Sequence, residues 1–308
     1  MKPTMRWYRD EDDYWRIRAF LRDVFLLNGR RERSWHVARL DYWRWHLIAT
    51  CECCPPVPEV TLLWETAAGD IAAVLHPVYA GEVFLHMNPA FRTQALEEEV
   101  LAVAEERFAA DTSDGRRYLV VNRDRDDELR LAVLTERGYR KWGEPVHHWS
   151  RDLDAAIPAV PVAAGYTIRS MGDVDEHPAR SWASWRAFHP DDPDEAYEGW
   201  EWYSNIQAGP LYRRDLDVVA ATEAGEIAAF CTIWYDDVTR SGVCVLVGTA
   251  AEHQRRGLGK AVIWEGLRRM QRLGGTRAFA NGYDAAANAL YGAALGTLEL
   301  SDSWVKTW

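Results

Sequence analysis

Residues 243–262 read VCVLVGTAAEHQRRGLGKAV, and the change of pattern within this stretch decides the fold of the second half of the chain. The apolar run at its start predicts a buried strand over about 242–247. Apolar side chains then recur at helical spacing from Leu258, which predicts a helix over about 258–273. The loop 248–259 joins the two elements.

This loop has the composition of an anion-binding site. Gly257 and Gly259 lack Cβ atoms, so the backbone can bend sharply there and approach a ligand closely. The helix that begins at the loop offers unpaired N–H groups and the positive end of its dipole, and Arg255, Arg256 and Lys260 add positive charge. Together these features predict a pyrophosphate site. The alternative is a tight strand-to-helix turn with arginines on its surface.

The rest of the second half predicts an α+β domain. Alternating and apolar runs indicate further strands at 166–169, 217–222, 227–235, 277–281 and about 303–308. Helical patterns are expected at about 175–188, 202–208 and 285–295.

The first half follows the same order in weaker form. Strands are expected at 60–64, 71–75, 83–87, 118–122 and about 146–152, with helices at 95–109 and 128–137. We interpret this as a structural duplication, which predicts two tandem α+β domains, 1–155 and 156–308. Each domain is expected to hold a mixed, mostly antiparallel sheet flanked by helices.

Two motifs give the second half a family resemblance. Gln254-x-x-Gly257-x-Gly259 after a strand resembles the acyl-CoA pyrophosphate loop of the GNAT N-acetyltransferases. The later stretch 284–296, with Asn288 and Tyr291, is similar to that family's Asn-x-x-Ala-x-x-x-Tyr-x-x-x-Gly-Phe helix. The resemblance covers about 166–308, and the tandem arrangement resembles two-domain acyltransferases such as the mycothiol synthases.

The resemblance implies roles for individual residues. Tyr291 would protonate the CoA thiolate as it leaves, which suits a phenol with an ordinary pKa of about 10. The donor, acetyl-CoA or another acyl-CoA, would be held by Val247, Thr249, Gln254, Arg255, Arg256, Gly257, Leu258, Gly259, Lys260 and Asn288. The alternative for Tyr291 is a core aromatic residue on an alanine-rich helix.

The sequence departs from the family pattern in both halves. Asp284 stands where the helix motif has its first Asn, Thr297 where it has Phe, and Gly296 follows Tyr291 by five positions instead of four. The first half has no glycine loop, and its corresponding helix begins with the acidic run 97–99. Carboxylates at a helix start would repel a pyrophosphate, so we predict a degenerate domain without CoA.

The resemblance implies an N-acyltransferase in which a primary amine attacks the acyl-CoA directly in a ternary complex. The segment 189–203 combines six acidic residues with Trp200, Trp202 and Tyr203, which favours a small cationic acceptor. An exposed acidic loop with inward-packed aromatic rings is the alternative. The strand 243–247 has no carboxylate, so the base stays unassigned among Asp236, Asp237, Glu252 and His189.

Two other functional classes stay open: a non-catalytic acyl-CoA sensor, and an interaction protein that keeps the fold without the ligand. Both halves are acidic within a net charge of −11, which argues against a nucleic-acid surface. The polar start and the absence of a long apolar run predict a cytoplasmic protein without a membrane span. We also expect a monomer or a homodimer. Cys51, Cys53 and Cys54 have no second cysteine pair, so no metal is expected.

Overall fold

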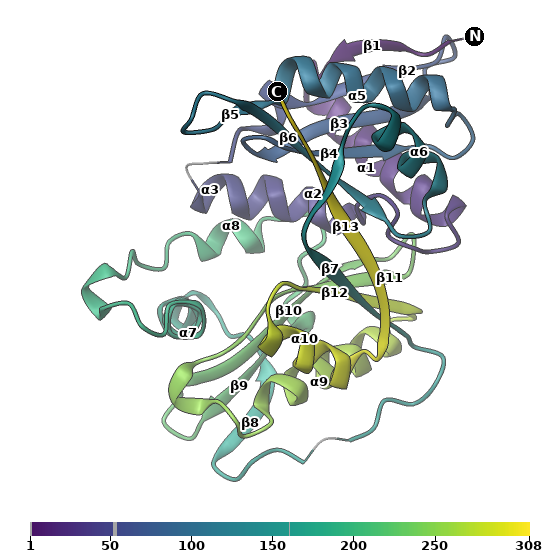
Figure 1. The fold of residues 1–308 in the computed structure, drawn as a ribbon. Coiled ribbons are helices and arrows are strands. Elements are labelled where there is room, and N and C mark those ends of the chain that lie inside the picture. The colour runs from purple at the N-terminus through teal and green to yellow at the C-terminus, as the bar shows by residue number, and fades with distance from the viewer. Residues whose placement is uncertain (1, 52–53, 160) are drawn as a thin grey trace. The chain divides into compact units, whose positions relative to one another are not determined.

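A computed structural model describes residues 2–51, 54–159 and 161–308. The chain divides into two compact units, Met1–Val146 with Leu300–Trp308 (unit 1) and His147–Glu299 (unit 2). Each unit contains its own set of paired strands and the helices that cover them (Figure 1). Among the described residues, no helix is both long enough and apolar enough to span a bilayer.

The sheet of unit 2 has the strand order β7-β12-β11-β10-β9-β8. Its strands are β7 (Arg140–Asp152), β8 (Tyr166–Ser170), β9 (Asp217–Thr222), β10 (Ile227–Asp236), β11 (Ser241–Thr249) and β12 (Arg277–Gly282). Only the part of β7 from His147 onward belongs to unit 2. Neighbours are antiparallel except β11 and β12, which are parallel. The expected mixed, mostly antiparallel sheet is confirmed.

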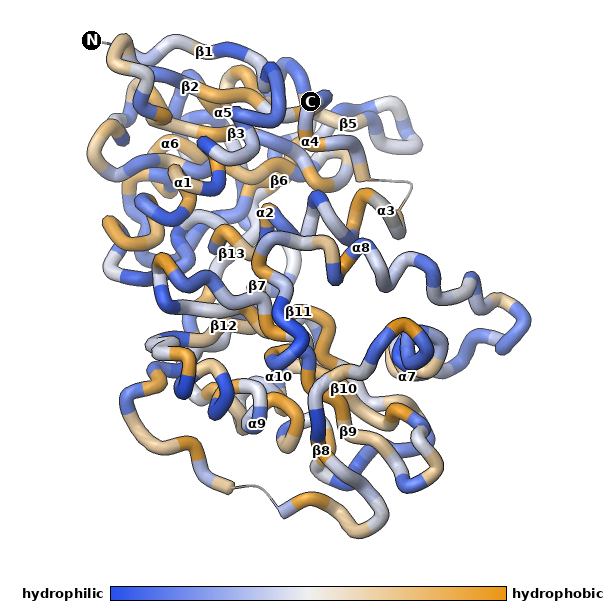
Figure 2. The backbone as a smooth tube through the Cα atoms, turned by 180° about the vertical axis from the view of Figure 1, so that it is seen from behind, coloured by the Kyte–Doolittle hydropathy of each residue, from blue (hydrophilic) through white to orange (hydrophobic). Residues whose placement is uncertain are grey.

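The described residues of unit 2 form the α-helices α7 (His177–Phe188), α8 (Tyr203–Gln207), α9 (Leu258–Arg272) and α10 (Ala285–Ala294). Short 3₁₀ turns are η2 (Val174–Glu176), η3 (Asp194–Ala196), η4 (Arg214–Leu216) and η5 (Ala251–His253). The apolar side of α9, whose alternating hydropathy can be followed in Figure 2, packs in one core with Cys231 and Ile233 of β10. Phe230 and Thr232 alternate with these and point to the opposite face of the sheet.

Unit 1 repeats this topology, with strand order β1-β2-β3-β4-β6-β13 and β5 paired to β6. The strands are β1 (Thr4–Trp7), β2 (Leu62–Glu65), β3 (Ile71–Tyr79), β4 (Glu82–Met87), β5 (Ala110–Asp111), β6 (Arg117–Asp124) and β13 (Thr297–Thr307, in unit 1 from Leu300). The helices are α1 (Glu11–Leu27), α2 (Val37–Tyr42), the π-helix η1 (Trp43–Leu47), α3 (Ile48–Thr50), α4 (Val57–Val60), α5 (Gln94–Phe108) and α6 (Glu128–Glu136). Strands β4 and β6 are parallel, and helix α5 lies between them in the sequence. In unit 2, α9 lies in the same way between the parallel strands β11 and β12.

The last strand of each unit comes from the other half of the sequence. Residues 147–152 of β7 pair with β12, and residues 301–307 of β13 pair with β6. The sequence suggested instead that 146–152 closes the first domain and 303–308 the second. The units therefore differ from the expected domains 1–155 and 156–308. Periodicity identifies a strand but not its partner, because every antiparallel edge offers the same hydrogen-bonding groups.

Candidate functional site

The C-terminal part of strand β11 is not paired with β12, which leaves that edge of the strand open to a ligand. It pairs with β12 only from Ser241 to Val243 and then runs on to Thr249. On its other side the register with β10 shifts so that Leu246 is an extra residue, with φ of 63°. This is a β-bulge. A positive φ is energetically costly for a non-glycine residue, and both bulges and residues in such strained conformations are over-represented at functional sites.

The N-terminus of α9 follows this open strand. Gly257 is the N-cap residue with φ of 77°, and no side chain caps the helix. Arg255 is also left-handed, with φ of 62°. Within the described residues, the N–H groups of 255–260 donate no hydrogen bond. Six neighbouring donors at the positive end of a helix fit an anionic group such as a pyrophosphate.

Close packing fixes the loop against β11. A Cβ atom at Gly259 would lie 3.2 Å from Oγ1 of Thr249, so helix and strand approach as closely as a glycine permits. Gln254 donates from Nε2 to the Thr249 carbonyl at 3.3 Å. The predicted residues Thr249, Gln254 and Gly259 are thus brought together. At Gly257, by contrast, a Cβ would meet no atom within 4 Å.

The three basic side chains of the loop differ in how they are held. Nη1 of Arg256 donates to the Tyr166 hydroxyl at 2.8 Å, and Nη2 donates to the Glu252 carbonyl at 3.3 Å. Lys260 places its ammonium 4.3 Å from the ring centre of Trp264. Arg255 is exposed. The structure therefore anchors Arg256 to the protein and leaves Arg255 at the surface of the loop.

Tyr291 and Asn288 lie on α10. Tyr291 is only 8% exposed and packs in the core that contains Cys231, Cys244 and Val247, at the point where β11 leaves β12. Burial, with smaller contributions from Cys244 and Cys231, raises the pKa of the Tyr291 phenol. This phenol is therefore protonated at neutral pH, as a proton donor must be, although a raised pKa also makes it a weaker acid.

The Asn288 side chain is anchored from β7. Its Oδ1 accepts a hydrogen bond from Nε1 of Trp149 at 2.9 Å. Asp284, which replaces the family's Asn, is the N-cap of α10 and accepts from the Ala287 N–H at 2.8 Å. That departure preserves the helix start, since Asp and Asn cap equally well.

None of the four candidate bases is directed to this site by a contact. Asp236 accepts hydrogen bonds from Thr239 within its own turn, and Asp237 is exposed. Glu252 pairs with Arg186 at 2.7 Å, and His189 contacts Asp192 at 2.8 Å. The base remains unassigned.

A polar cluster on the other face of the sheet was not anticipated from the sequence. Asp217, fully buried, accepts hydrogen bonds from the hydroxyls of Tyr203, Tyr212 and Thr232. Burial, followed by the charge of Asp217, raises the pKa of both tyrosines. The one available signal was an acidic residue at the first position of an otherwise apolar strand.

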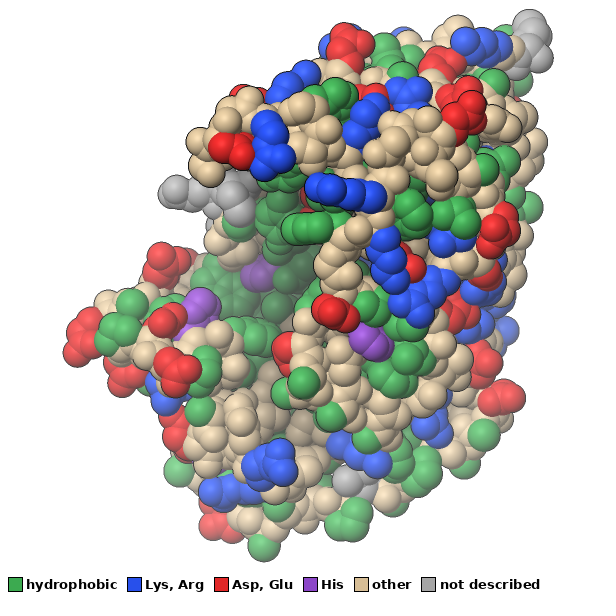
Figure 3. Space-filling view, viewed as in Figure 1, with side chains coloured by type: hydrophobic (Ala, Val, Ile, Leu, Met, Phe, Trp, Pro, Cys, Tyr) green, Lys and Arg blue, Asp and Glu red, His purple; other side chains and the backbone are tan. Residues whose placement is uncertain are grey.

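The acidic segment between α7 and α8 gives a cationic acceptor little geometric support. Acidic side chains gather over this segment on the face shown in Figure 3, and five of them are exposed along 191–198. The rings instead pack toward the protein, since Tyr203 is buried and Nε1 of Trp202 donates to Ser181 at 2.9 Å. Outward carboxylates beside inward rings match the alternative of an exposed acidic loop.

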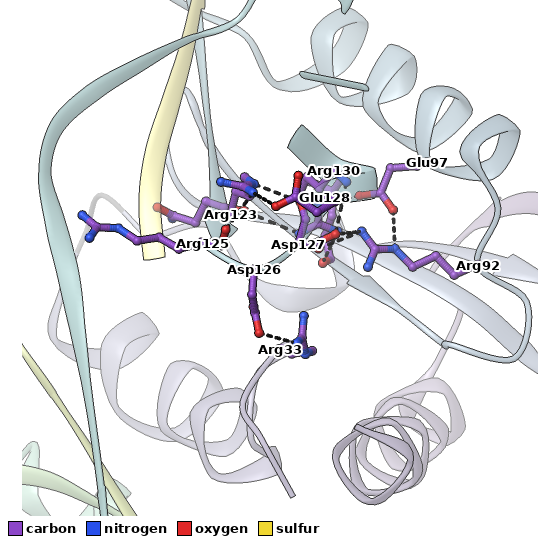
Figure 4. A network of polar contacts seen from close by, with 11 residues as sticks. Arg33, Arg92, Glu97, Arg123, Arg125, Asp126, Asp127, Glu128 and Arg130 are labelled. Atoms are coloured by element: carbon purple, nitrogen blue, oxygen red, sulfur yellow. Dashed lines mark hydrogen bonds and ion pairs between the residues drawn. The ribbon is translucent and has the colours of Figure 1, made fainter. Parts of the chain in front are cut away.

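The corresponding helix start in unit 1 is filled by the protein itself (Figure 4). Thr93 caps α5, and Glu97 in its first turn is 1% exposed. Arg92 donates to Glu97 at 2.7 Å, Arg130 also donates to it, and Arg92 pairs with Asp127 at 2.8 Å. Burial alone would raise the pKa of Glu97, but the charges and hydrogen bonds of Arg130 and Arg92 outweigh it and lower the pKa.

The described residues contain no candidate metal site. No cluster of three or more His, Cys, Asp or Glu side chains among them could hold a metal ion. Cys53, one of the three neighbouring cysteines, lies outside the described residues.

Residues 178–297 match the acetyltransferase (GNAT) family, and this match lies entirely in unit 2. Over these residues the chain is similar to the GNAT acetyltransferases, which supports an acetyltransferase enzyme. Acetyl-CoA is the acyl donor that this family uses. A comparison with the curated proteins gives no match.

Solved structures extend the likeness to the fold of both units. A GCN5-related N-acetyltransferase from Sphaerobacter thermophilus aligns with a TM-score of 0.61 at 16% identity, over 99% of this chain and 95% of its own. A tandem GNAT protein from the clavulanic acid biosynthesis pathway gives 0.59 at 14%, over 99% and 98%. A GNAT-family acetyltransferase from Colwellia psychrerythraea gives 0.62 at 10%, over 98% and 100%. The expected tandem GNAT fold is confirmed.

Proposed function

We propose that unit 2 transfers an acetyl group from acetyl-CoA to a primary amine of a small molecule. The observation that carries this proposal is the uncapped start of α9, where six adjacent N–H groups have no partner among the described residues. It lies directly after a strand whose edge is open from Cys244 to Thr249. An anion site beside an open strand edge suits a molecule with a pyrophosphate and an amide-containing arm.

The donor would be held mainly by backbone groups. The amides of Arg255, Arg256, Gly257, Leu258, Gly259 and Lys260 would bind the pyrophosphate, while the basic side chains add a weaker, screened attraction. The amides of the pantetheine arm can pair with Val247 and Thr249 as a neighbouring strand would. Gln254 holds the loop to Thr249, and Asn288 has amide donors to offer, because Trp149 occupies only its oxygen.

Acetyl-CoA supplies an activated thioester to which an uncharged amine nitrogen can add. Transfer forms the carbon–nitrogen bond, breaks the carbon–sulfur bond and requires one proton to leave the amine and one to reach the departing sulfur. We assign the second proton to the phenol of Tyr291, which burial keeps protonated at neutral pH. No covalent intermediate on the protein is needed, so both substrates would be bound together.

Calorimetric titration with acetyl-CoA tests the donor site. We expect one binding site per chain, because the equivalent place in unit 1 is occupied by Glu97 and its arginines. In Gly257→Glu the added carboxylate has room but faces the pyrophosphate, so affinity should fall by roughly a hundredfold or more.

Gly225→Glu is the matched control. Gly225 lies in the β9–β10 turn of the same unit, with φ of 86° and no atom within 4 Å of a Cβ, so it carries similar strain and the same charge. Its affinity for acetyl-CoA should be unchanged. Equal losses in both variants would point to a folding defect, and the absence of binding by the unmutated protein would overturn the proposed function.

A further inference from the structure

Arg180 is a buried cation that forms no ion pair among the described residues. It lies on α7 with 0% of its surface exposed. Its three side-chain nitrogens, Nε, Nη1 and Nη2, have no hydrogen-bond partner among the described residues. An arginine stays protonated in proteins, so it cannot relieve this situation by losing its charge. A buried charge that lacks a partner is unfavourable, so an anionic group of a ligand would gain a favourable interaction here.

The other buried arginines of the chain show how this protein normally treats such a group. Arg18 pairs with Asp41 at 2.9 Å, Arg130 pairs with Glu97, and Arg123 donates to the carbonyls of Asp127 and Arg125. Of the four arginines that the described structure buries, Arg180 alone has none of these arrangements. Its isolation is thus specific to one place in unit 2.

The acidic residue near Arg180, Asp217, already accepts three hydrogen bonds from other side chains. Asp217 lies on the same face of the sheet, where Tyr203, Tyr212 and Thr232 donate to its two oxygens. It forms no ion pair with Arg180 within the described structure. Instead the guanidinium carbon of Arg180 lies 3.5 Å from the ring centre of Phe230 and 5.1 Å from that of Tyr203.

Arg180 is also adjacent to the strand assigned to the acetyl donor. Phe230 on β10 is the register partner of Gly248 on β11, between Val247 and Thr249. A Cβ at Gly248 would lie 2.5 Å from Cζ of Phe230 and 2.9 Å from Cβ of Ala187 on α7. The same ring therefore contacts Arg180 and Gly248 of the donor strand, so a single aromatic ring separates the guanidinium from that strand. Helix α7, which carries Arg180, lies beside the sheet of unit 2 in Figure 1.

We propose that Arg180 binds an anionic group of the acceptor, a carboxylate or a phosphate carried on the same small molecule as the amine. The planar guanidinium matches both groups in a two-point hydrogen bond. This inference rests on the proposed function and adds a substrate class to it: an amino acid or a phosphorylated amine in place of a purely cationic one. Arg180 has no exposed surface, so the acceptor must displace part of its cover, which includes Tyr203 of α8.

The test compares amines in matched pairs. Free amino acids are set against their amides, and phosphoethanolamine against ethanolamine, with acetyl-CoA consumption as the readout. The unmutated protein should prefer the anionic member of at least one pair by roughly tenfold or more in kcat/KM. In Arg180→Met that preference should disappear through a rise in KM of roughly tenfold to a hundredfold, with kcat and acetyl-CoA affinity unchanged.

The control variant is Arg214→Met, which removes an exposed arginine paired with Asp173 in the same unit and should behave as the unmutated protein. A further readout is stability: without substrate, Arg180→Met should unfold no more easily than the unmutated protein, since it removes an unpaired buried charge. The preferred pair then separates carboxylate from phosphate as the anion.

Three results would overturn the inference while leaving the donor site intact. They are an equal preference in Arg180→Met and the unmutated protein, faster reaction of the neutral amines, and no turnover of any anionic amine by a protein that binds acetyl-CoA. Failure to bind acetyl-CoA at all is a different outcome, because it removes the proposed function from which the inference starts.

Discussion

The start of α9 in unit 2 and the start of α5 in unit 1 hold the same place in two copies of one topology, yet they are completed in opposite ways. Helix α9 begins at Gly257 without a side-chain cap, and its first amides have no partner among the described residues. Helix α5 begins with the cap Thr93 and the buried carboxylate of Glu97, which Arg92 and Arg130 neutralise (Figure 4).

This difference indicates how one fold can serve two purposes. A helix start favours an anion, and the anion can belong to a ligand or to the chain itself. In unit 1 the chain supplies its own carboxylate, and the arginines around it join α5 to the loop before α6. The sequence suggested repulsion between a pyrophosphate and the acidic run 97–99, whereas the structure shows a site that is already filled.

The helices α10 and α6 extend the comparison to the chemistry. Asp284 caps α10 and Asp127 caps α6, and the seventh residue after the cap is Tyr291 in one and Leu134 in the other. Both side chains are buried. Only unit 2 therefore has a side chain with a dissociable proton at this position, as the role proposed for Tyr291 requires.

The largest expected effect comes from removing this proton donor. In Tyr291→Phe the ring still fills the core, but the departing thiolate loses its acid, so kcat should fall by roughly 10²- to 10⁴-fold. Acetyl-CoA affinity by calorimetry should stay unchanged. The control is Tyr283→Phe, an exposed tyrosine one residue before the cap of the same helix, which should keep full activity. A Tyr291→Phe variant with unimpaired kcat would show that water protonates the thiolate.

The second effect is on the stability of unit 1. Glu97→Gln removes the carboxylate between Arg92 and Arg130 and leaves buried positive charge, which should lower the free energy of unfolding by about 3 kcal/mol. Denaturant titration measures it, with Glu98→Gln as the control, since Glu98 is only half-buried and accepts one hydrogen bond from Gln94. Acetyl-CoA affinity should not change, because the donor site is assigned to unit 2.

The same variant has a defined pH dependence. The pKa of Glu97 is lower in the folded protein than its unfolded value of about 4.3, so its stabilising effect is complete above that pH. It is lost as the pH falls through the folded pKa, where the carboxylate takes up a proton. The difference in stability between Glu97→Gln and the unmutated protein should therefore shrink below about pH 4. A difference that grows in acid would contradict the assigned ion pairs.

Local patterns explain how much of this arrangement the sequence could predict. Strand β9 has the expected bounds 217–222, and α9 and α10 match the expected helices to within one residue. Their starts depend on Gly257 and Asp284, and their apolar spacing is a short-range property of the chain. The order of elements around the loop 248–259 was for the same reason accessible without coordinates.

Other features depend on which distant segments meet. The bulge puts Leu246 at positive φ within an apolar strand, and no glycine or asparagine in the sequence marks this position. The exchange of β7 and β13 depends on the choice between two similar sheet edges. The isolation of Arg180 follows from burial by Phe230 and Tyr203, and burial of one helical arginine among several is a tertiary property.

The smallest expected effect divides the donor site between backbone and side chains. Unit 1 fills its helix start with charged side chains, whereas the first backbone amides of α9 in unit 2 have no partner among the described residues. If these amides provide most of the affinity for acetyl-CoA, removing a single arginine should change that affinity little. Arg255→Gln should weaken acetyl-CoA binding about two- to fivefold at low salt, since Arg255 is exposed and its attraction is screened. Arg256→Gln should weaken it less, because Tyr166 and the Glu252 carbonyl already hold that guanidinium.

Titrations at about 0.02 M and 0.5 M salt separate the two contributions, because screening acts on the side-chain charges and spares the short backbone hydrogen bonds. The loss in Arg255→Gln should nearly vanish at the higher concentration. A larger loss in Arg256→Gln than in Arg255→Gln would mean that Arg256 leaves Tyr166 when the donor binds. In that case arginine side chains would contact the anion at the helix start in unit 2, as they do in unit 1. The two units would then differ only in the source of the anion, which is a ligand in unit 2 and Glu97 in unit 1.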